Sequence, residues 1–212
     1  MNKTIKSLAK ELSLNPRTVV LFLKSKGYKD LSPDSVLNDT QVSLVEDAFS
    51  KDKNKNLKIA VFVGSFDPFT VGHEAIVRRA LSLFDKIVIG IGYNVNKKNF
   101  FPVEKRIKWI RQTFSDIPDR IEVMEYDGLT VEFAREVGAK YILRGIRTSS
   151  DFEYERAISQ TNKMLAPEIE SVFLLTLPEH TPITSTIVRD ILKHGGDASK
   201  FLPYKIDKED LI

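Results

Sequence analysis

The feature that most constrains the fold is an apolar strand that runs into a glycine-flanked loop and then into a helix. Residues 59–63 read Ile-Ala-Val-Phe-Val, without a polar break. This is the pattern of a strand buried on both faces of a parallel sheet. The loop 64–72 begins and ends on glycine, and apolar residues between 76 and 84 then recur with helical spacing. The stretch therefore predicts an α/β fold.

The same stretch predicts binding of an anion. Backbone amides at the N-terminus of a helix attract negative charge, so phosphate is the expected ligand. His73 stands at the start of this helix, and one of its ring nitrogens can reach a bound oxyanion. For a lone histidine, a local hydrogen bond at the helix end would be the ordinary interpretation. The loop is neither a Walker A motif nor Gly-x-Gly-x-x-Gly.

The rest of the chain continues the alternation of strands and helices. Four more strands are expected, at residues 86–93, 120–126, 140–143 and 171–177. The fold class is therefore predicted as α/β, a Rossmann-like doubly wound parallel five-stranded sheet. Trp109 is expected to be partly exposed or at a subunit contact, and residues 204–212 are expected to form a charged tail.

Three further groups are suited to phosphate, and each follows an expected strand. Lys97 lies in the loop 94–99, and lysine is a flexible point charge. The block Arg144-Gly-Ile-Arg147 could clamp phosphates bidentately, although salt bridges to Asp151 or Glu153 are the structural alternative. Thr184 or Ser185 would cap the last main helix, leaving the hydroxyls and amides of residues 185 and 186 toward an anion. Together with the loop before His73, these groups fit one ligand with several phosphates.

These blocks resemble those of a known family. Gly64-Ser-Phe-Asp-Pro68 followed by Thr70-Val-Gly-His73 resembles the signature of phosphopantetheine adenylyltransferases, within the nucleotidyltransferase superfamily. Arg144–Arg147 with Asp151-Phe-Glu-Tyr-Glu155 resembles the second block of that family, and residues 183–189 resemble its last one. The resemblance covers about residues 58–203. Two positions depart from the pattern: Asn99 replaces a frequent proline, and His180 a frequent aromatic residue.

The resemblance implies a reaction and its participants. It implies transfer of AMP from ATP to 4′-phosphopantetheine, giving dephospho-CoA and pyrophosphate, without a covalent enzyme intermediate. Mg²⁺ is expected on the polyphosphate, with mostly water ligands and no protein ligand assigned. A homohexamer is expected from the family. Two enzyme alternatives are sister nucleotidyltransferases that act on nicotinamide mononucleotide or on glycerol phosphate. A nucleotide-sensing or nucleic-acid-tethering protein is the alternative from another class.

The resemblance also implies roles for residues of this chain. His73 and Lys97 would stabilise the transition state at the α-phosphate, and Ser65 would bond to the reacting phosphates. Arg144 would hold the acceptor phosphate, and Thr130 would line the pantetheine slot. The residues implied around ATP are Ser65, Phe66, His73, Gly145, Ile146, Arg147, Glu155, His180, Thr181, Pro182, Ile183, Thr184, Ser185 and Thr186.

The N-terminal part reads as a separate module. Residues 1–50 are expected to form a small all-α, helix-turn-helix-like unit, with a polar linker at 51–56 before the nucleotidyltransferase domain at 57–212. The module is similar to the small N-terminal domain of bacterial translation initiation factor two. Contact with nucleic-acid phosphates through Arg17, Lys24 and Lys26 is one interpretation. A docking or oligomer-facing domain is the other, and we favour it.

Composition narrows the class of protein. The chain has no cysteine, which excludes disulfides and thiolate metal sites. No apolar run is long enough to span a bilayer, and no signal peptide is evident, so a cytoplasmic protein is expected. The net charge of +3 comes entirely from residues 1–56, which hold ten Lys/Arg and seven Asp/Glu. Such a small surplus is usually solvated surface.

Overall fold

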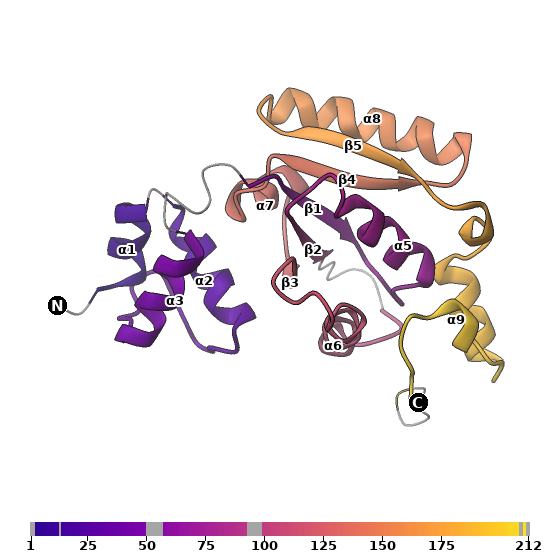
Figure 1. Cartoon of the computed structure of the whole chain (residues 1–212), viewed down its shortest axis with the longest axis horizontal. Helices are drawn as coiled ribbons and strands as arrows, with labels where there is room; N and C mark the ends of the chain where they lie inside the picture. The colour runs from indigo at the N-terminus through magenta and orange to yellow at the C-terminus, as the bar shows by residue number, and fades with distance from the viewer. Residues whose placement is uncertain (1–2, 13, 50–56, 93–98, 208–209, 211–212) are drawn as a thin grey trace. The chain divides into compact units, whose positions relative to one another are not determined.

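A computed structural model describes residues 3–12, 14–49, 57–92, 99–207 and 210 (Figure 1). The chain divides into two compact units. One contains the N-terminal residues as far as Leu57 together with 135–138, and the other contains the remainder. The expected linker at 51–56 and the predicted catalytic residue Lys97 lie outside the described residues.

The described residues of the N-terminal unit form three short helices, α1 (Ile5–Leu12), α2 (Pro16–Ser25) and α3 (Asp39–Phe49). Asparagine side chains cap two of these helices. The Asn15 side chain accepts a hydrogen bond from the amide of Arg17 at 2.9 Å, and the Asn38 side chain accepts one from the amide of Gln41 at 2.8 Å. The apolar faces of the helices meet in a core of Ile5, Leu8, Ala9, Val19, Val20, Phe22, Leu23, Leu37 and Val45.

The larger unit is built on the expected five-stranded parallel sheet. Its strands are β1 (Ile59–Gly64), β2 (Lys86–Gly92), β3 (Ile121–Tyr126), β4 (Tyr141–Ile146) and β5 (Glu170–Leu175), in the order β3-β2-β1-β4-β5. The chain moves outward from β1 to β3 and then returns to the other side of β1. The strand order therefore reverses between β1 and β4, which is where open α/β sheets bind ligands.

Helices cover both faces of this sheet. They are α5 (Val71–Ala80), α6 (Val103–Thr113), α7 (Thr130–Glu136), α8 (Ser149–Leu165) and α9 (Ser185–Lys193), with short 3-10 turns at Pro178–His180 and Ser199–Phe201. On one face, Ile76 of α5 and Ile110 of α6 share a core with Ile89 of β2. On the other face, the ring of Phe133 in α7 lies over Gly90, so closely that an added Cβ would meet it at 2.5 Å.

Two expectations about the surface are wrong. Trp109 is only 3 % exposed, because its ring stacks on Tyr204 with centroids 5.1 Å apart and meets Phe101 edge-on. Tyr204, the first residue of the expected charged tail at 204–212, is itself buried. The segment after residue 201 therefore packs on the side of α6 that carries Trp109, a side for which the helical period predicts no partner.

The fourth strand also differs from its expected length. It extends through Ile146, so Arg144 and Gly145 lie inside the strand and not in the loop after it. Gly145 is a place of close packing, since an added Cβ would lie 3.2 Å from the side chain of Ile76. The backbone of Arg144 is consequently fixed by the pairing of β4 with β5.

Candidate active site

A cavity of about 330 Å³ lies where β1 and β4 end. It is bounded by the β1–α5 loop (residues 65–70), the N-terminus of α5, the end of β4 and the N-terminus of α9. Eleven of the predicted site residues line it: Ser65, Phe66, His73, Arg144, Gly145, Arg147, His180, Ile183, Thr184, Ser185 and Thr186. Ile146, Thr181 and Pro182 are not among its lining residues, and Thr130 and Glu155 line a second cavity.

His73 is the third residue of α5, and its ring is fixed by the residue that caps the helix. The Nδ1 atom of His73 accepts a hydrogen bond from the backbone amide of Thr70 at 3.0 Å and lies 2.9 Å from the Thr70 hydroxyl. This is a capping box in which histidine replaces the usual Glu or Gln. Because Nδ1 accepts, the neutral ring carries its proton on Nε2. Nε2–H is therefore the group with which His73 can donate to an oxyanion.

The surroundings of His73 keep it neutral. The rings of Phe66 and Phe69 lie with centroids 5.2 Å from the imidazole, and Phe62 lies at 6.3 Å. Burial among these rings, and then the charge of Arg147, lower the pKa of His73 to about 4. At neutral pH the residue is a hydrogen-bond donor without a net charge.

The β1–α5 loop is held through its carbonyl groups. The Ser65 carbonyl accepts from Arg106 at 2.6 Å. The carbonyls of residues 67, 68 and 69 accept in turn from the guanidinium of Arg189, the hydroxyl of Ser185 at 2.8 Å and the hydroxyl of Tyr204 at 2.9 Å. Three segments distant in sequence, α6, α9 and the residues after 201, thus fix the loop, which includes Phe66 at a left-handed φ of 45°.

Two buried charges lie behind this loop. The Asp67 carboxylate accepts from the backbone amides of Phe100 and Phe101 at 2.7 and 2.9 Å, which ties the loop to the segment before α6. Arg106 is 2 % exposed, and its Nε has no partner among the described residues. Burial lowers the pKa of Arg106 from its ordinary value. Neither side chain lines the cavity, so both stabilise the loop from the side opposite the cavity.

The N-terminus of α9 matches the expectation only in part. Thr184 is the cap, since its hydroxyl accepts from the amide of Ile187 at 3.1 Å. The Ser185 hydroxyl was expected to point toward an anion but is donated to the Pro68 carbonyl, as described above. The Thr186 hydroxyl accepts from Arg189 at 3.1 Å. The backbone amides of residues 185 and 186 remain as donors toward the cavity.

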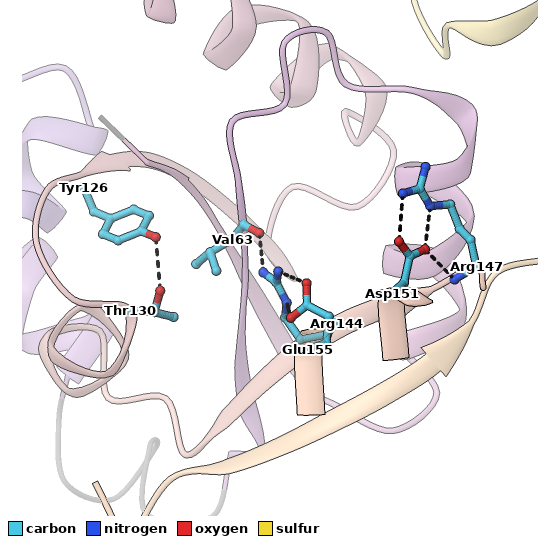
Figure 2. A network of polar contacts seen from close by, with 7 residues as sticks. All are labelled: Val63, Tyr126, Thr130, Arg144, Arg147, Asp151 and Glu155. Atoms are coloured by element: carbon cyan, nitrogen blue, oxygen red, sulfur yellow. Dashed lines mark hydrogen bonds and ion pairs between the residues drawn. The ribbon is translucent and has the colours of Figure 1, made fainter. Parts of the chain in front are cut away.

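Both arginines of the second block form ion pairs with acids of α8, as Figure 2 shows. Arg144 donates through Nε to Glu155 at 2.7 Å, through Nη2 to the other oxygen of Glu155, and through Nη1 to the Val63 carbonyl at 2.9 Å. Arg147 donates through Nε to Asp151 at 3.0 Å. Burial alone would raise the pKa of Asp151, but Arg147 holds that pKa below its ordinary value.

A second cavity, of about 200 Å³, lies beside the first. Val63, Gly64 and Arg144 line both cavities. The other residues that line the second cavity belong to β3, β4, β5, α7 and α8. The hydroxyls of Tyr126 and Thr130 lie 3.3 Å apart at its wall (Figure 2). Because Arg144 borders both spaces, molecules bound in the two cavities would meet beside its guanidinium.

Sequence reasoning missed the residues that support the site from outside it. Asp67 occurs in the first matched motif, but nothing in the sequence assigns a partner to it or to Arg106. Tyr204 directly follows Phe-Leu-Pro, where the sequence predicts the start of a charged tail. Their roles depend on contacts between distant segments, which neither periodicity nor spacing reveals.

Solved structures share this fold at low sequence identity. A bifunctional NMN adenylyltransferase/ADP ribose pyrophosphatase from Francisella tularensis superposes with a TM-score of 0.54 at 21 % identity, covering 70 % of this chain and 46 % of that one. A putative nicotinate-nucleotide adenylyltransferase from Vibrio parahaemolyticus gives 0.51 at 20 % identity, covering 69 % and 87 %. At such identities the likeness concerns the fold alone.

Sequence relatives are much more similar. The cytidylyltransferase-like family model matches residues 61–191. A phosphopantetheine adenylyltransferase from Cytophaga hutchinsonii is 52 % identical over 149 residues, which are 70 % of this chain and 99 % of that protein. One from Bacteroides thetaiotaomicron is 52 % identical over 147 residues, 69 % of this chain and 96 % of that protein. The chain therefore belongs to the phosphopantetheine adenylyltransferases, within the cytidylyltransferase-like family.

Proposed function

We propose that the chain transfers the AMP group of ATP to the phosphate of 4′-phosphopantetheine, giving dephospho-CoA and pyrophosphate. The observation that carries the proposal is the pair of adjacent cavities that share Arg144 and Gly64. A group transfer needs a donor and an acceptor that meet at one phosphorus atom. The names of the relatives indicate which acceptor this is.

The first cavity is the proposed ATP site. Its walls offer the Nε2–H of His73, the hydroxyl of Ser65, the guanidinium of Arg147 and the first-turn amides of α9. All of these can donate hydrogen bonds, and the N-termini of α5 and α9 both border the cavity, which suits a polyphosphate. His180 is a further lining residue, at the position where the family often has an aromatic side chain.

The second cavity is the proposed acceptor site. Arg144 uses three of its five N–H bonds on Glu155 and Val63, so one on each terminal nitrogen is left for a phosphate. Thr130 and Tyr126 give the wall hydroxyl groups, and Ile158 gives it an apolar surface. A chain that alternates amide and methylene groups, as pantetheine does, fits such a mixed lining.

The chemistry is a direct in-line displacement. An oxygen of the acceptor phosphate attacks the α-phosphorus of ATP, the bond from that phosphorus to the β-phosphate bridging oxygen breaks, and pyrophosphate leaves with the electron pair. Nucleophile and leaving group are both phosphates, so no strong base is required. His73 and Ser65 then act by positioning and by donating to the charge that builds on the α-phosphate. The same role is proposed for Lys97, which lies outside the described residues.

Mg²⁺ is proposed to accompany ATP. The described residues that line the first cavity offer hydroxyls, imidazoles and guanidinium groups but no carboxylate. They do not form a ligand set for a hard cation, so the metal would be held by phosphate oxygens and water. The Asp67 carboxylate nearby is already occupied by two backbone amides.

Self-association, with a hexamer as the expected form, is supported by one face of the larger unit. Helix α8 buries none of its described residues, and the edge strand β5 beside it is paired on one side only (Figure 1). Large apolar side chains are exposed there: Phe152, Tyr154, Met164, Leu165 and Leu175. A second copy of the chain would cover them. Light scattering in dilute solution tests this, and a monomer would contradict it.

Other expectations from the sequence stay predictions. Among the described residues, no helix is long and apolar enough to cross a membrane. The cytoplasmic location and the nucleic-acid role of Arg17, Lys24 and Lys26 have no further support.

The test is pyrophosphate release from ATP with 4′-phosphopantetheine, nicotinamide mononucleotide and glycerol phosphate in parallel. We expect release with phosphopantetheine only, and a loss of about a hundredfold or more in His73→Ala, as for removal of one transition-state donor. His194→Ala, at an exposed position, is the matched control. Release with another acceptor would overturn the substrate, and no release with any acceptor would overturn the activity.

A further inference from the structure

We infer that Tyr204 is a positioning residue for the reaction, because its hydroxyl fixes the peptide group that determines which nitrogen of His73 carries the proton. The inference rests on the proposed function, in which His73 donates to the α-phosphate. Tyr204 lines neither of the two cavities, so it contacts neither of the proposed substrate sites. Its effect on the reaction therefore passes through the groups that it holds.

One peptide group connects Tyr204 to His73. The carbonyl of the peptide between Phe69 and Thr70 accepts a hydrogen bond from the Tyr204 hydroxyl at 2.9 Å. The N–H of the same peptide donates to Nδ1 of His73 at 3.0 Å. A peptide group is planar, and in the trans form its C=O and N–H point in opposite directions. Holding the carbonyl therefore also fixes the direction of the N–H, and bonds at both ends of one amide strengthen each other.

The amide contact decides which tautomer of His73 is present. Two groups of Thr70 lie near Nδ1: the backbone N–H and, at 2.9 Å, the side-chain hydroxyl. The hydroxyl can donate or accept, so it fits either tautomer. The N–H can only donate, so it fits only the ring that carries its proton on Nε2. If the peptide turned, Nδ1–H could donate to the hydroxyl, and Nε2 would lose the proton that it offers to the α-phosphate.

Tyr204 is itself held in place at this position. Its side chain is buried, and its ring stacks on Trp109 with the ring planes 12° apart. Burial raises the pKa of Tyr204 above its ordinary value, and the charge of Asp67 adds to the rise. The hydroxyl therefore keeps its proton and remains a donor. Phe69 and Thr70 are both buried, so water has little access to the peptide that the hydroxyl holds.

The test compares Tyr204→Phe with wild type in two measurements. Histidine-selective ¹⁵N NMR at neutral pH reports which ring nitrogen carries the proton, and His73→Gln identifies the signal of His73 among the three histidines. We expect Nε2–H alone in wild type and a mixture of both tautomers in Tyr204→Phe. The kcat with ATP and 4′-phosphopantetheine should fall about tenfold, as for a misplaced catalytic group, while KM for each substrate changes less than about twofold.

Phe84→Leu is the control for a loss of stability alone. The ring of Phe84 packs against that of Tyr141 with centroids 5.2 Å apart. This contact lies at the end of the sheet where β2 and β4 begin, opposite the cavities. The substitution should destabilise the same unit and leave both the tautomer of His73 and the kcat of the folded protein unchanged.

A double-mutant cycle separates action through His73 from action on the rest of the loop. If Tyr204 acts through His73, then Tyr204→Phe should lower kcat no further once His73→Ala is present. A further fall would overturn the inference, and so would a Tyr204→Phe chain that keeps Nε2–H alone and the wild-type kcat. Failure of the wild-type chain to use phosphopantetheine would overturn the proposed function. The nitrogen signals would then decide by themselves whether Tyr204 sets the tautomer.

Discussion

His73 couples the stability of the larger unit to pH. Burial lowers its pKa to about 4 in the folded chain, whereas in the unfolded chain the value is near 6.5. Between these two values the unfolded state binds a proton that the folded state does not. The contribution of His73 to the free energy of unfolding is therefore fully present above about pH 6.5 and is lost as the pH falls toward 4. At pH 5 the loss amounts to about 2 kcal/mol relative to pH 7.5.

The substitution His73→Gln isolates this contribution. Glutamine at the third helical position can still accept from the Thr70 amide, so the capping box is kept while the titrating group is removed. The assay is urea unfolding at pH 7.5 and pH 5, followed by tryptophan fluorescence. Trp109 is the only tryptophan of the chain, so the signal reports the unit that contains the site.

The expected result is that acidification lowers the free energy of unfolding more in the wild-type chain than in His73→Gln. On acidification the wild-type chain should lose about 2 kcal/mol more than His73→Gln, because contributions of other titrating groups cancel. His194→Gln, at the exposed end of α9, keeps His73 and should keep its acid-dependent loss. Equal losses in wild type and His73→Gln would refute the argument that burial among the phenyl rings holds His73 neutral.

Two further predictions concern packing around the site, both measured by the same unfolding assay. Tyr204→Phe leaves the Phe69 carbonyl without its buried donor and should cost about 1–3 kcal/mol, whereas Tyr154→Phe, at a position 68 % exposed, should stay within about 0.5 kcal/mol of wild type. Equal effects would show that the Tyr204 hydroxyl does not hold the loop. Gly90→Ala should lower the free energy of unfolding by about 1–3 kcal/mol, because the new Cβ would lie 2.5 Å from a buried ring. Gly92→Ala is the control and should lower it less, because the nearest neighbour of that Cβ lies at 3.6 Å. The reverse order of the two losses would contradict the packing described.

The sheet and most of the first cavity follow from the sequence for local reasons. A β-branched run such as residues 59–63 has few alternatives to a buried strand, and capping residues such as Asn15 and Thr184 mark helix starts directly. Since parallel strands end at one edge of a sheet, motifs that follow strands are brought together. His73, Arg144 and the start of α9 meet for this reason.

What the sequence did not reveal depends on pairing between distant segments. The period of α6 marks the face toward the sheet, but nothing local shows that Tyr204 covers the other side of Trp109. In the sequence, a hydroxyl such as that of Ser185 could donate equally well to a ligand or to a backbone carbonyl. Its actual acceptor, the Pro68 carbonyl, is known only from the tertiary structure. Glu155 is the same case for an acid within reach of an arginine.

The carbonyl contacts of the β1–α5 loop also determine when, during synthesis, the site can form. Their donors, which belong to Arg106, Ser185, Arg189 and Tyr204, lie 41, 117, 122 and 135 residues beyond the groups they bind. At about 5–20 residues per second, the last donor is made roughly 7–27 s after the loop itself. A chain that stops before residue 204 thus carries the motif without all of its supporting contacts, so the proposed nucleotide site reaches its full geometry only after that residue has been made.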